Sequence, residues 1–209
     1  MPRRPASRKP RSQLRKTPRQ ARSKATLAAI LEGAARILAE AGPRAVTTNR
    51  IAARAGVSVG SLYQYFPNRS AVLRALIERE LGRAERARPA AIDDASLPLA
   101  RRVEAVVAWQ LAVHAANPAL SRNLTRLVGE ALPREERVRL ASAREARVRE
   151  TVRSLLGPRP GRDVALVALV VDGCLAALTD AAVSRRATAL AERGLADELT
   201  LLLTRYLEG

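Results

Sequence analysis

Side chains that can hydrogen-bond to a partner are concentrated in one stretch, from Thr47 to Ser70. It reads TTNRIAARAGVSVGSLYQYFPNRS and holds three of the five aromatic residues in the chain. Within it, Val59 to Tyr65 forms a segment too short and too polar for an ordinary core helix. Its leading end carries Gly60 and Ser61, which are small enough to let it approach another surface closely. A helix with a small, polar leading end suits insertion into the DNA major groove.

The residues around this segment predict a helix, a tight turn and a second helix. Thr47 is a plausible N-cap, and Gly56 lies where the first helix must end, because glycine accepts the left-handed conformation found just past a helix. Ser58 can cap the second helix through its hydroxyl. On spacing alone, a helical hairpin in an all-helical core is the alternative.

The charge distribution separates these two interpretations. Residues Met1 to Arg79 contain 17 Lys or Arg and three acids, a net of +14, whereas the remaining 130 residues contain 20 basic and 17 acidic residues, a net of +3. Lys and Arg that neutralise phosphates are the main sequence-independent source of DNA affinity. An anionic membrane would also attract this charge, but the basic N-terminal arm lacks a large apolar face to bury in lipid. The pattern favours DNA.

The run VTTNRIAARAGVSVGSLYQYFPNRSAVLRAL resembles the DNA-binding domain of the tetracycline-repressor (TetR) family of regulators. The matching residues are Thr47, Ile51, Ala52, Ala55, Gly56, Val57, Ser58, Gly60, Ser61, Leu62, Tyr63, Tyr65, Phe66, Asn68 and Leu73. Upstream, ATLAAILEGAARILAEAG resembles the family's first helix and ends at Gly42. Two departures are mild: Gly33 interrupts the first helix where Ala is commoner, and Arg69 stands where Lys is frequent.

A set of DNA-contacting residues follows as a hypothesis. We expect bases to be read by Ser58, Val59, Gly60, Ser61 and Gln64, and phosphates to be held by Tyr63, Tyr65 and Arg69. Thr47 and Thr48 are expected to add backbone N–H and hydroxyl contacts to phosphate. Asn49 and Arg50 are candidates for either kind of contact.

The expected fold is all-α, with an N-terminal three-helix helix-turn-helix DNA-binding domain and a helical ligand-binding and dimerisation domain. We place a disordered basic arm at residues 1–21, the DNA-binding domain at 22–82 and the regulatory domain at 83–209. The arm has four prolines, eight basic residues and no acid, so it cannot bury apolar surface. It is either a solubilising tail or an extension that follows phosphates or enters the minor groove.

Beyond a loop at Pro89 to Pro98, five helical stretches are expected. They are Leu99 to Ala116, Leu120 to Leu132, Arg134 to Leu156, Val164 to Val183 and about Leu190 to Leu207. The family resemblance implies that the last two pair with their copies in a second subunit. Val164 to Val183 has little solvated face, and Gly173, Ala176 and Ala177 allow close helix approach. The alternative for this stretch is a central buried helix of a monomer.

Candidate effector-contacting residues are drawn from the regulatory domain, whose aromatic residues are only Trp109 and Tyr206. They are Trp109, Val113, His114, Asn117, Asn123, Leu127 and Asp172. A mainly aliphatic lining favours a neutral or cationic, largely apolar small molecule over a polyanion. Asp172 is the only charge between Val164 and Thr179, and a carboxylate there must pair with Arg across the dimer, join a polar network or face a ligand.

Little in the sequence indicates catalysis or a bound metal. His114 is the only histidine, which excludes a metal cluster built from several histidines. Cys174, the single cysteine, is either an inert core thiol or a redox sensor, and it fits a reducing cytoplasm. The apolar run from Val164 to Val171 is far shorter than the roughly 20 residues of a membrane span and ends at Asp172. We expect no catalytic residues, no metal and no cofactor, and a cytoplasmic protein without membrane partners.

The sequence therefore predicts a dimeric, ligand-responsive transcriptional regulator that binds an operator in double-stranded DNA and is most simply a repressor. Two other classes stay open. One is a constitutive or architectural DNA-binding protein with no effector. The other is an enzyme with an accessory DNA-binding domain, for which the sequence shows no catalytic constellation.

Overall fold

The computed structural model describes residues 21–157, 161–185 and 193–209. The basic arm expected at residues 1–21 lies outside these ranges except for its last residue. In the described ranges all regular structure is helical, so the all-α expectation is confirmed. The chain divides into two compact units, one up to Glu80 and the other from Leu81 onward.

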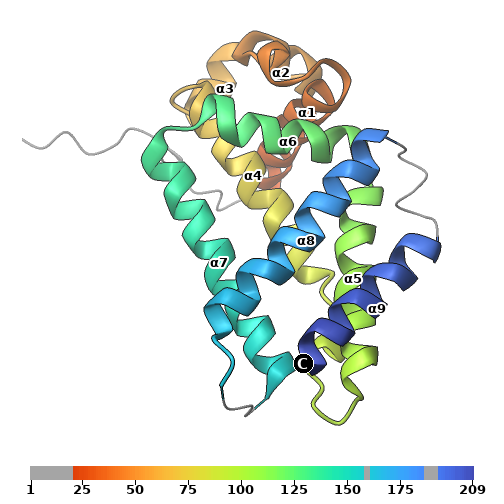
Figure 1. Ribbon diagram of the computed structural model, residues 1–209. Coiled ribbons are helices and arrows are strands. Elements are labelled where there is room, and N and C mark those ends of the chain that lie inside the picture. Colours follow the sequence, from red (N-terminus) through yellow and green to blue (C-terminus); the bar gives the residue numbers. More distant parts are fainter. Residues whose placement is uncertain (1–20, 158–160, 186–192) are drawn as a thin grey trace, which may run out of the picture. The chain divides into compact units, whose positions relative to one another are not determined.

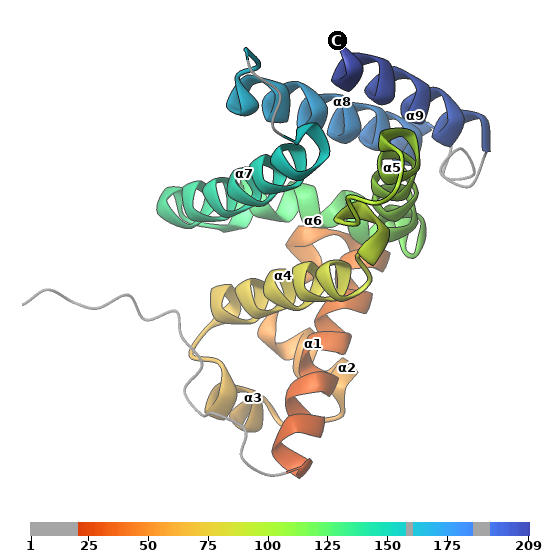
Figure 2. The same ribbon diagram turned by 90° about the horizontal axis from the view of Figure 1, so that it is seen from below.

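The N-terminal unit consists of α1 (Ala21–Ala41), the short 3-10 helix η1 (Pro43–Ala45), α2 (Thr48–Ala55), α3 (Val59–Tyr65) and most of α4 (Arg69–Arg86) (Figure 2). Helix α1 stops at Gly42, whose φ of 75° suits glycine. Apolar residues at helical spacing bury one face of each helix against the others. The largest fully buried side chains of this unit are Ile30, Ile37, Leu38, Ile51, Leu62, Phe66, Leu73 and Leu76.

Gly33, which departs from the family pattern, lies at the closest approach of α1 to α2. A Cβ atom at this position would lie 3.3 Å from the backbone nitrogen of Ala55 and 3.4 Å from the carbonyl oxygen of Ile51. Glycine in a helix interior costs about 1 kcal/mol relative to alanine. Here the missing side chain lets the two helices pack backbone to backbone, which is a physical reason for the glycine.

The C-terminal unit contains η2 (Ala90–Ile92), α5 (Leu99–Ala115), α6 (Pro118–Ala131), α7 (Arg134–Leu156), α8 (Val164–Arg185) and α9 (Arg193–Glu208). In Figure 1, α5 packs beside α9, and α7 packs beside α8. These helices enclose one core that includes Ile92, Val103, Val107, Leu111, Val152, Leu156, Val167, Val171, Leu199, Leu203 and Leu207. The observed helices α5 to α8 begin and end close to the expected residues, whereas the start expected for the last helix, about Leu190, lies outside the described residues. The short η2 turn is an addition inside the expected loop.

A buried arginine fastens the loop before α5. Arg102 is only 6% exposed. Its Nε donates to the carbonyl oxygen of Ile92 at 3.0 Å, and its Nη2 donates to the hydroxyl of Ser154 at 2.7 Å. A buried guanidinium is tolerated when its donors are satisfied in this way. Arg102 therefore holds η2 and α7 against α5.

Helix α8 is apolar yet largely uncovered. Among the described residues, Val164–Ser184 is the one stretch long and apolar enough to cross a membrane by length and composition, although only 28% of it is buried. Such a helix is weak support for a membrane span, because core and interface helices share its composition. Asp172 interrupts the apolar run within this helix, as the sequence indicates, but the apolar residues continue beyond it to Ser184. The exposed apolar face of α8 needs another explanation.

Candidate DNA-binding and ligand-binding sites

The helix-turn-helix forms through the capping residues expected from the sequence. The hydroxyl of Thr47 accepts from the backbone N–H of Arg50 at 3.3 Å, which caps α2. Gly56 ends α2 in the left-handed conformation, at φ 66° and ψ 32°. The hydroxyl of Ser58 accepts from the backbone N–H of Ser61 at 3.0 Å, which caps α3. These bonds satisfy donors that a helix start leaves without partners.

Helix α3 has one face in the core and one face in solvent. Leu62 is fully buried, and Tyr65 is 8% exposed. On the other face, Tyr63 is 41% exposed and Val59 36%. Ser58, Gly60 and Gln64 share this exposed face, whereas Ser61 is half-buried. Because the core fixes the inner face, the outer face is presented as a rigid surface.

The two tyrosines of α3 have different surroundings. The hydroxyl of Tyr63 is hydrogen-bonded to that of Thr48 at 3.4 Å, next to the start of α2. The hydroxyl of Tyr65 is hydrogen-bonded to that of Ser23 on α1 at 3.1 Å. Tyr63 therefore belongs to the exposed surface, whereas Tyr65 belongs to the core. The exposure of Tyr63 is consistent with the phosphate contact predicted for it, whereas Tyr65 is buried; both contacts stay predictions.

Arg69 is half-buried, and its guanidinium donates to the protein backbone. Its Nε donates to the carbonyl oxygen of Val46 at 2.5 Å, and its Nη2 donates to that of Pro43 at 2.7 Å. Pro43 is the first residue of η1 and Val46 follows its last residue, in the segment that leads into α2. The sequence predicted a phosphate contact for Arg69, and the structure instead gives its guanidinium two backbone partners.

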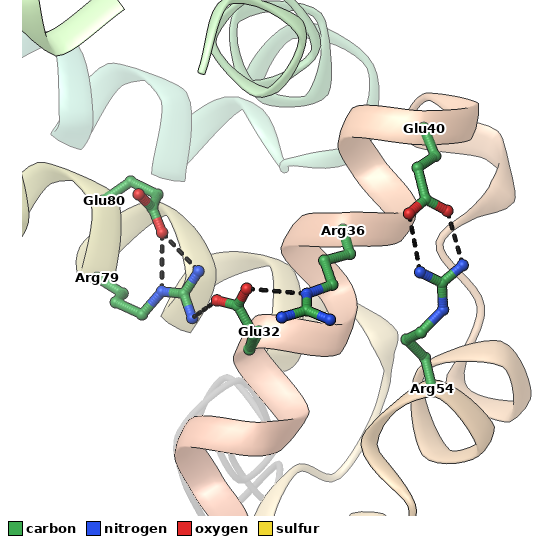
Figure 3. Close-up of polar contacts among 6 residues, drawn as sticks. All are labelled: Glu32, Arg36, Glu40, Arg54, Arg79 and Glu80. Carbon is green, nitrogen blue, oxygen red and sulfur yellow. Dashed lines mark hydrogen bonds and ion pairs between the residues drawn. The ribbon is translucent and has the colours of Figure 1, made fainter. Parts of the chain in front are cut away.

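Acidic side chains neutralise arginines on one side of the unit, as Figure 3 shows. Glu32 on α1 pairs with Arg36 at 3.1 Å and with Arg79 of α4 at 3.5 Å. Glu40 pairs with Arg54, near the end of α2, at 2.6 Å. These pairs are solvent-exposed to varying degrees, and such pairs contribute little stability. Their larger effect is that they neutralise the charges of these arginines.

Basic charge is left unneutralised near the start of α2. Arg44 of η1 and Arg50 of α2 are exposed, and neither forms an ion pair with the part of the chain described here. Thr47 and Asn49 are exposed beside them, and Thr48 is half-buried. This surface combines positive charge with hydroxyl and amide groups, which suits contacts with a phosphate backbone.

Pairing between Glu40 and Arg54 shifts the pKa of both groups. The hydrogen bond from Arg54 lowers the pKa of Glu40, and nearby arginine charges lower it further. The same hydrogen bond raises the pKa of Arg54. Both groups therefore stay charged near neutral pH, and Arg54 is committed to Glu40.

Among the candidate ligand residues, Trp109 and Asn117 have identifiable structural partners. The indole N–H of Trp109 donates to the carbonyl oxygen of Ala84 in the last turn of α4, at 2.9 Å. The amide oxygen of Asn117 accepts from the backbone N–H of Leu120 at 2.9 Å and caps α6. Asn117 is exposed, so its position is accounted for by capping.

His114 is the centre of a polar cluster between helices. Its Nδ1 is hydrogen-bonded to the hydroxyl of Ser121 on α6, and its Nε2 to the side-chain amide of Gln110 at 3.2 Å. Burial lowers the pKa of His114; the charge of Asp180 on α8 acts to raise it, and that of Arg144 on α7 to lower it. The residues described contain no group of three or more His, Cys, Asp and Glu able to hold a metal ion.

Asp172 is paired within its own chain. Nε and Nη2 of Arg144, on α7, both donate to one carboxylate oxygen of Asp172, at 3.1 and 2.8 Å. This accounts for the charge in an apolar helix without a partner from a second subunit. Of the other candidates, Asn123 and Leu127 are buried on α6, and Val113 is half-buried on α5. Cys174 is half-buried against the core of this unit.

Sequence reasoning missed several residues that the structure brings into these sites. Arg44 stands in a turn with no capping or periodic pattern to mark it. Ser121, Gln110 and Arg144 surround His114 or Asp172, but contacts between separate helices leave no local signal in the sequence.

The fold matches solved structures of bacterial regulators along most of the chain. A TetR-like regulator from Rhodococcus sp. RHA1 is 24% identical and superposes with a TM-score of 0.66, covering 93% of this chain and 100% of that one. The regulator FadR from Bacillus subtilis, solved in complex with stearoyl-CoA, is 20% identical with a TM-score of 0.70, covering 85% and 97%. At these identities the likeness shows a shared fold.

Curated relatives match a much shorter segment. The nucleoid occlusion factor SlmA of Haemophilus ducreyi is 55% identical over 40 residues, which are 19% of this chain and 20% of that protein. SlmA of Actinobacillus pleuropneumoniae serotype 5b is 52% identical over 40 residues. The match thus spans about a fifth of the length of these relatives.

Two family models together cover most of the chain. Residues 30–76 match the model described as bacterial regulatory proteins, tetR family, and residues 98–207 match the tetracyclin repressor-like C-terminal domain. The first includes the helix-turn-helix described above, and the second extends from the start of α5 to nearly the end of α9. The chain therefore belongs to the TetR family of DNA-binding transcriptional regulators.

Proposed function

We propose that this regulator is a cytoplasmic, homodimeric repressor that leaves its operator when a small molecule binds the C-terminal unit. The observation that carries the proposal is the rigid exposed face of α3, flanked by the uncommitted charge of Arg44 and Arg50. Base edges in the major groove are read by Ser58, Val59, Gly60, Ser61 and Gln64. Phosphates or neighbouring bases are contacted by Tyr63, Thr47, Thr48, Asn49 and Arg50.

The dimer is supported by apolar side chains left in solvent on α8 and α9. Leu166 is 61% exposed and Leu169 is 69% exposed, and Val170, Leu178, Leu201 and Leu202 are exposed as well. Gly173 has open space around it, which permits close helix approach. Large apolar side chains exposed in such number on two helices favour an interaction site. A second copy of the chain, related by a two-fold axis, would cover it.

A dimer also explains how effector binding could act on DNA. Helix α4 runs without a break from the N-terminal unit into the C-terminal unit. A change in its tilt would alter the spacing of the two α3 helices, which must be about 34–36 Å apart to enter successive major grooves. An effector that prefers the wrongly spaced state lowers DNA affinity by linkage, typically by about 1–3 kcal/mol.

The effector is a largely apolar molecule, because aliphatic side chains dominate the interior of the C-terminal unit. The half-buried polar cluster of His114, Gln110 and Ser121 is the group of side chains with which a polar atom of such a ligand would exchange hydrogen bonds. Solved relatives include the FadR complex with stearoyl-CoA and the ketosteroid regulator KstR2 of Mycobacterium tuberculosis. Stearoyl-CoA and a neutral ketosteroid are therefore suitable first probes, and they differ sharply in charge.

The test is a DNA-binding titration with a labelled duplex from the region flanking the protein's own gene, with and without each probe. We expect Tyr63→Ala to weaken binding strongly, and Gln64→Ala to change the preference at one base pair by about 1–3 kcal/mol. A probe that raises the melting temperature should also release the DNA. A stabilising probe that leaves DNA affinity unchanged would refute the release mechanism.

The dimer is tested by sedimentation of two charge-introducing variants. Leu169→Glu places a charge in the middle of the exposed face of α8, and it should yield monomers with reduced DNA affinity. Val138→Glu is the matched control, because Val138 is also an exposed aliphatic residue, at 55%, but lies on α7 rather than on α8 or α9. Dissociation by both variants, or by neither, would contradict this interface.

A second candidate function is DNA binding without an effector, as in an architectural protein. It is favoured by the curated relatives, which are named as nucleoid occlusion factors, although the match is confined to 40 residues. This alternative predicts similar affinity for the flanking duplex and for unrelated DNA, and no ligand that alters either.

A further inference from the structure

The guanidinium of Arg69 bridges two backbone carbonyls, one at the first residue of η1 and one just after its last residue. These residues, Pro43 and Val46, lie 26 and 23 residues before Arg69 in the chain. Their oxygens accept from Nη2 and Nε at 2.7 and 2.5 Å. Arg69 is the first residue of α4, so the bridge fastens the start of α4 to the turn between α1 and α2.

This turn determines where α2 begins. Val46 is fully buried, and Thr47, the next residue, caps α2 through its hydroxyl. The carbonyl oxygen of Thr47 accepts from the N–H of Ile51 at 2.9 Å, which starts the hydrogen bonds of the helix. Thr48 in turn is hydrogen-bonded to Tyr63 of α3. Fixing Val46 therefore fixes the residues that present the expected phosphate contacts of α2.

The bridge uses what distinguishes arginine from lysine. The planar guanidinium holds its N–H groups in a fixed fork and can donate in two directions at once, whereas the ammonium of lysine is a compact point charge. Arg69 is half-buried, while Arg44 and Arg50 are exposed without ion pairs in the described ranges. The positive charge available to DNA is therefore that of Arg44 and Arg50, whereas the N–H groups of Arg69 donate to the protein backbone.

We propose that Arg69 is a positioning residue for DNA recognition: its guanidinium holds the α1–α2 turn against the start of α4 and thereby places α2, without contacting phosphate itself. The inference goes beyond the family assignment and replaces the phosphate contact predicted for Arg69 from the sequence. It rests on DNA binding by α2 and α3, which the unaltered protein tests independently in the same titrations.

The experiment compares Arg69→Lys and Arg69→Gln with Arg44→Gln and Arg50→Gln in the full-length protein. DNA affinity is measured against salt concentration with the labelled duplex from the flanking region. We expect both Arg69 variants to lose affinity about tenfold or more, with a salt dependence close to that of the unaltered protein. Loss of a phosphate contact instead lowers the slope of log K against log salt by about 0.9 per contact, as expected for Arg44→Gln or Arg50→Gln.

Arg69→Lys separates the two roles most sharply. It keeps the positive charge, so a phosphate contact would survive largely intact, but it removes the fork. If Arg69→Lys keeps full affinity while Arg69→Gln loses affinity and salt slope together, Arg69 contacts phosphate and the proposal is wrong. If both variants keep full affinity, the bridge has no role in DNA binding, and the proposal is also wrong.

Hydrogen exchange distinguishes positioning from a general loss of stability. In Arg69→Lys, the amide of Ile51 should exchange faster, because its acceptor belongs to the displaced start of α2. Core amides of α1, such as that of Leu38, should keep their protection if the unit stays folded. Equal loss of protection in both helices would show that Arg69 only stabilises the unit, which would overturn the positioning role.

Discussion

The indole N–H of Trp109 donates a hydrogen bond of 2.9 Å to the carbonyl oxygen of Ala84, which joins α5 to the last turn of α4. The same oxygen accepts from the backbone N–H of Ala87 at 3.1 Å. Carbonyls in the last turn of a helix lack the usual partner four residues on, and Trp109 adds a second donor to this one. The sole tryptophan of the chain therefore holds the end of the helix that connects the two units.

The first prediction concerns this bond. Trp109→Phe keeps an apolar ring but removes the donor, so the free energy of unfolding of the C-terminal unit should fall by about 1 kcal/mol. The effect of an effector on DNA affinity should also shrink, because α4 is less firmly held. Chemical denaturation and the DNA titration measure the two quantities.

Tyr206→Phe is the control for Trp109→Phe. Tyr206 lies on α9, and it is its backbone carbonyl, rather than its hydroxyl, that accepts from Arg162. We expect this variant to change neither the free energy of unfolding of the C-terminal unit nor the effect of an effector on DNA affinity. An unaltered effector response in Trp109→Phe would show that the bond does not transmit the signal.

The second prediction concerns Gly33 at the α1–α2 contact. Alanine should gain up to about 1 kcal/mol of helix propensity in a helix interior. At Gly33 this gain is offset because the new Cβ lies 3.3 Å from backbone, which cannot move aside as a side chain can. Thermal unfolding should therefore show Gly33→Ala to be no more stable than the unaltered protein, and Gly33→Val less stable by about 1–3 kcal/mol.

Gly82 of α4 provides the matched comparison. Its Cβ would meet only the end of the Arg86 side chain, at 3.2 Å, and that end is free to move. Gly82→Ala should therefore be stabilising by up to about 1 kcal/mol. Equal stabilisation by Gly33→Ala would mean that the helix contact is looser than the structure indicates.

The third prediction concerns Gly60 on the exposed face of α3. A Cβ here would have Ser58 Oγ as its nearest neighbour, at 3.9 Å, so alanine fits the fold without strain. We expect Gly60→Ala to leave the melting temperature unchanged or raised, yet to weaken DNA binding, because the added methyl group keeps α3 away from the groove. Gly129→Ala, at an exposed α6 position with open space, should likewise leave the melting temperature unchanged or raised, but it should leave DNA affinity unaltered. Normal DNA affinity in Gly60→Ala would remove this glycine from the interface.

The fourth prediction concerns pH. Burial lowers the pKa of His114 below the usual 6.5. The unfolded chain then binds a proton more readily than the folded one, so this contribution to stability is complete above pH 6.5 and is lost as pH falls toward the folded pKa. The free energy of unfolding of the C-terminal unit should decrease between pH 7.5 and about 5.5.

His114→Gln identifies the source of this decrease, since the chain has no other histidine. The variant should have a flatter stability profile over the same pH range, whatever its absolute stability. A profile parallel to that of the unaltered protein would assign the pH dependence to other groups.

Much of the helical fold and of the helix-turn-helix could be predicted from the sequence alone. The capping residues Thr47, Gly56 and Ser58 specified the helix-turn-helix, because capping depends on side chains and backbone within a few residues. The uneven charge and the motif density were sufficient to identify DNA as the partner. The helices also began and ended close to the expected residues, because prolines and glycines mark those positions locally.

Contacts between elements distant in sequence were decided only by the tertiary structure. Nothing local distinguishes Arg69, whose guanidinium faces backbone, from Arg50, whose side chain is exposed, and both were predicted to contact DNA. Asp172 pairs with Arg144, which lies 28 residues earlier in the chain. The close approach of the α2 backbone explains why residue 33 is a glycine. The same physical reason applies to Arg69, Asp172 and Gly33. Helix periodicity predicts which residues share a face of a helix, but only the tertiary packing determines which other residues that face contacts.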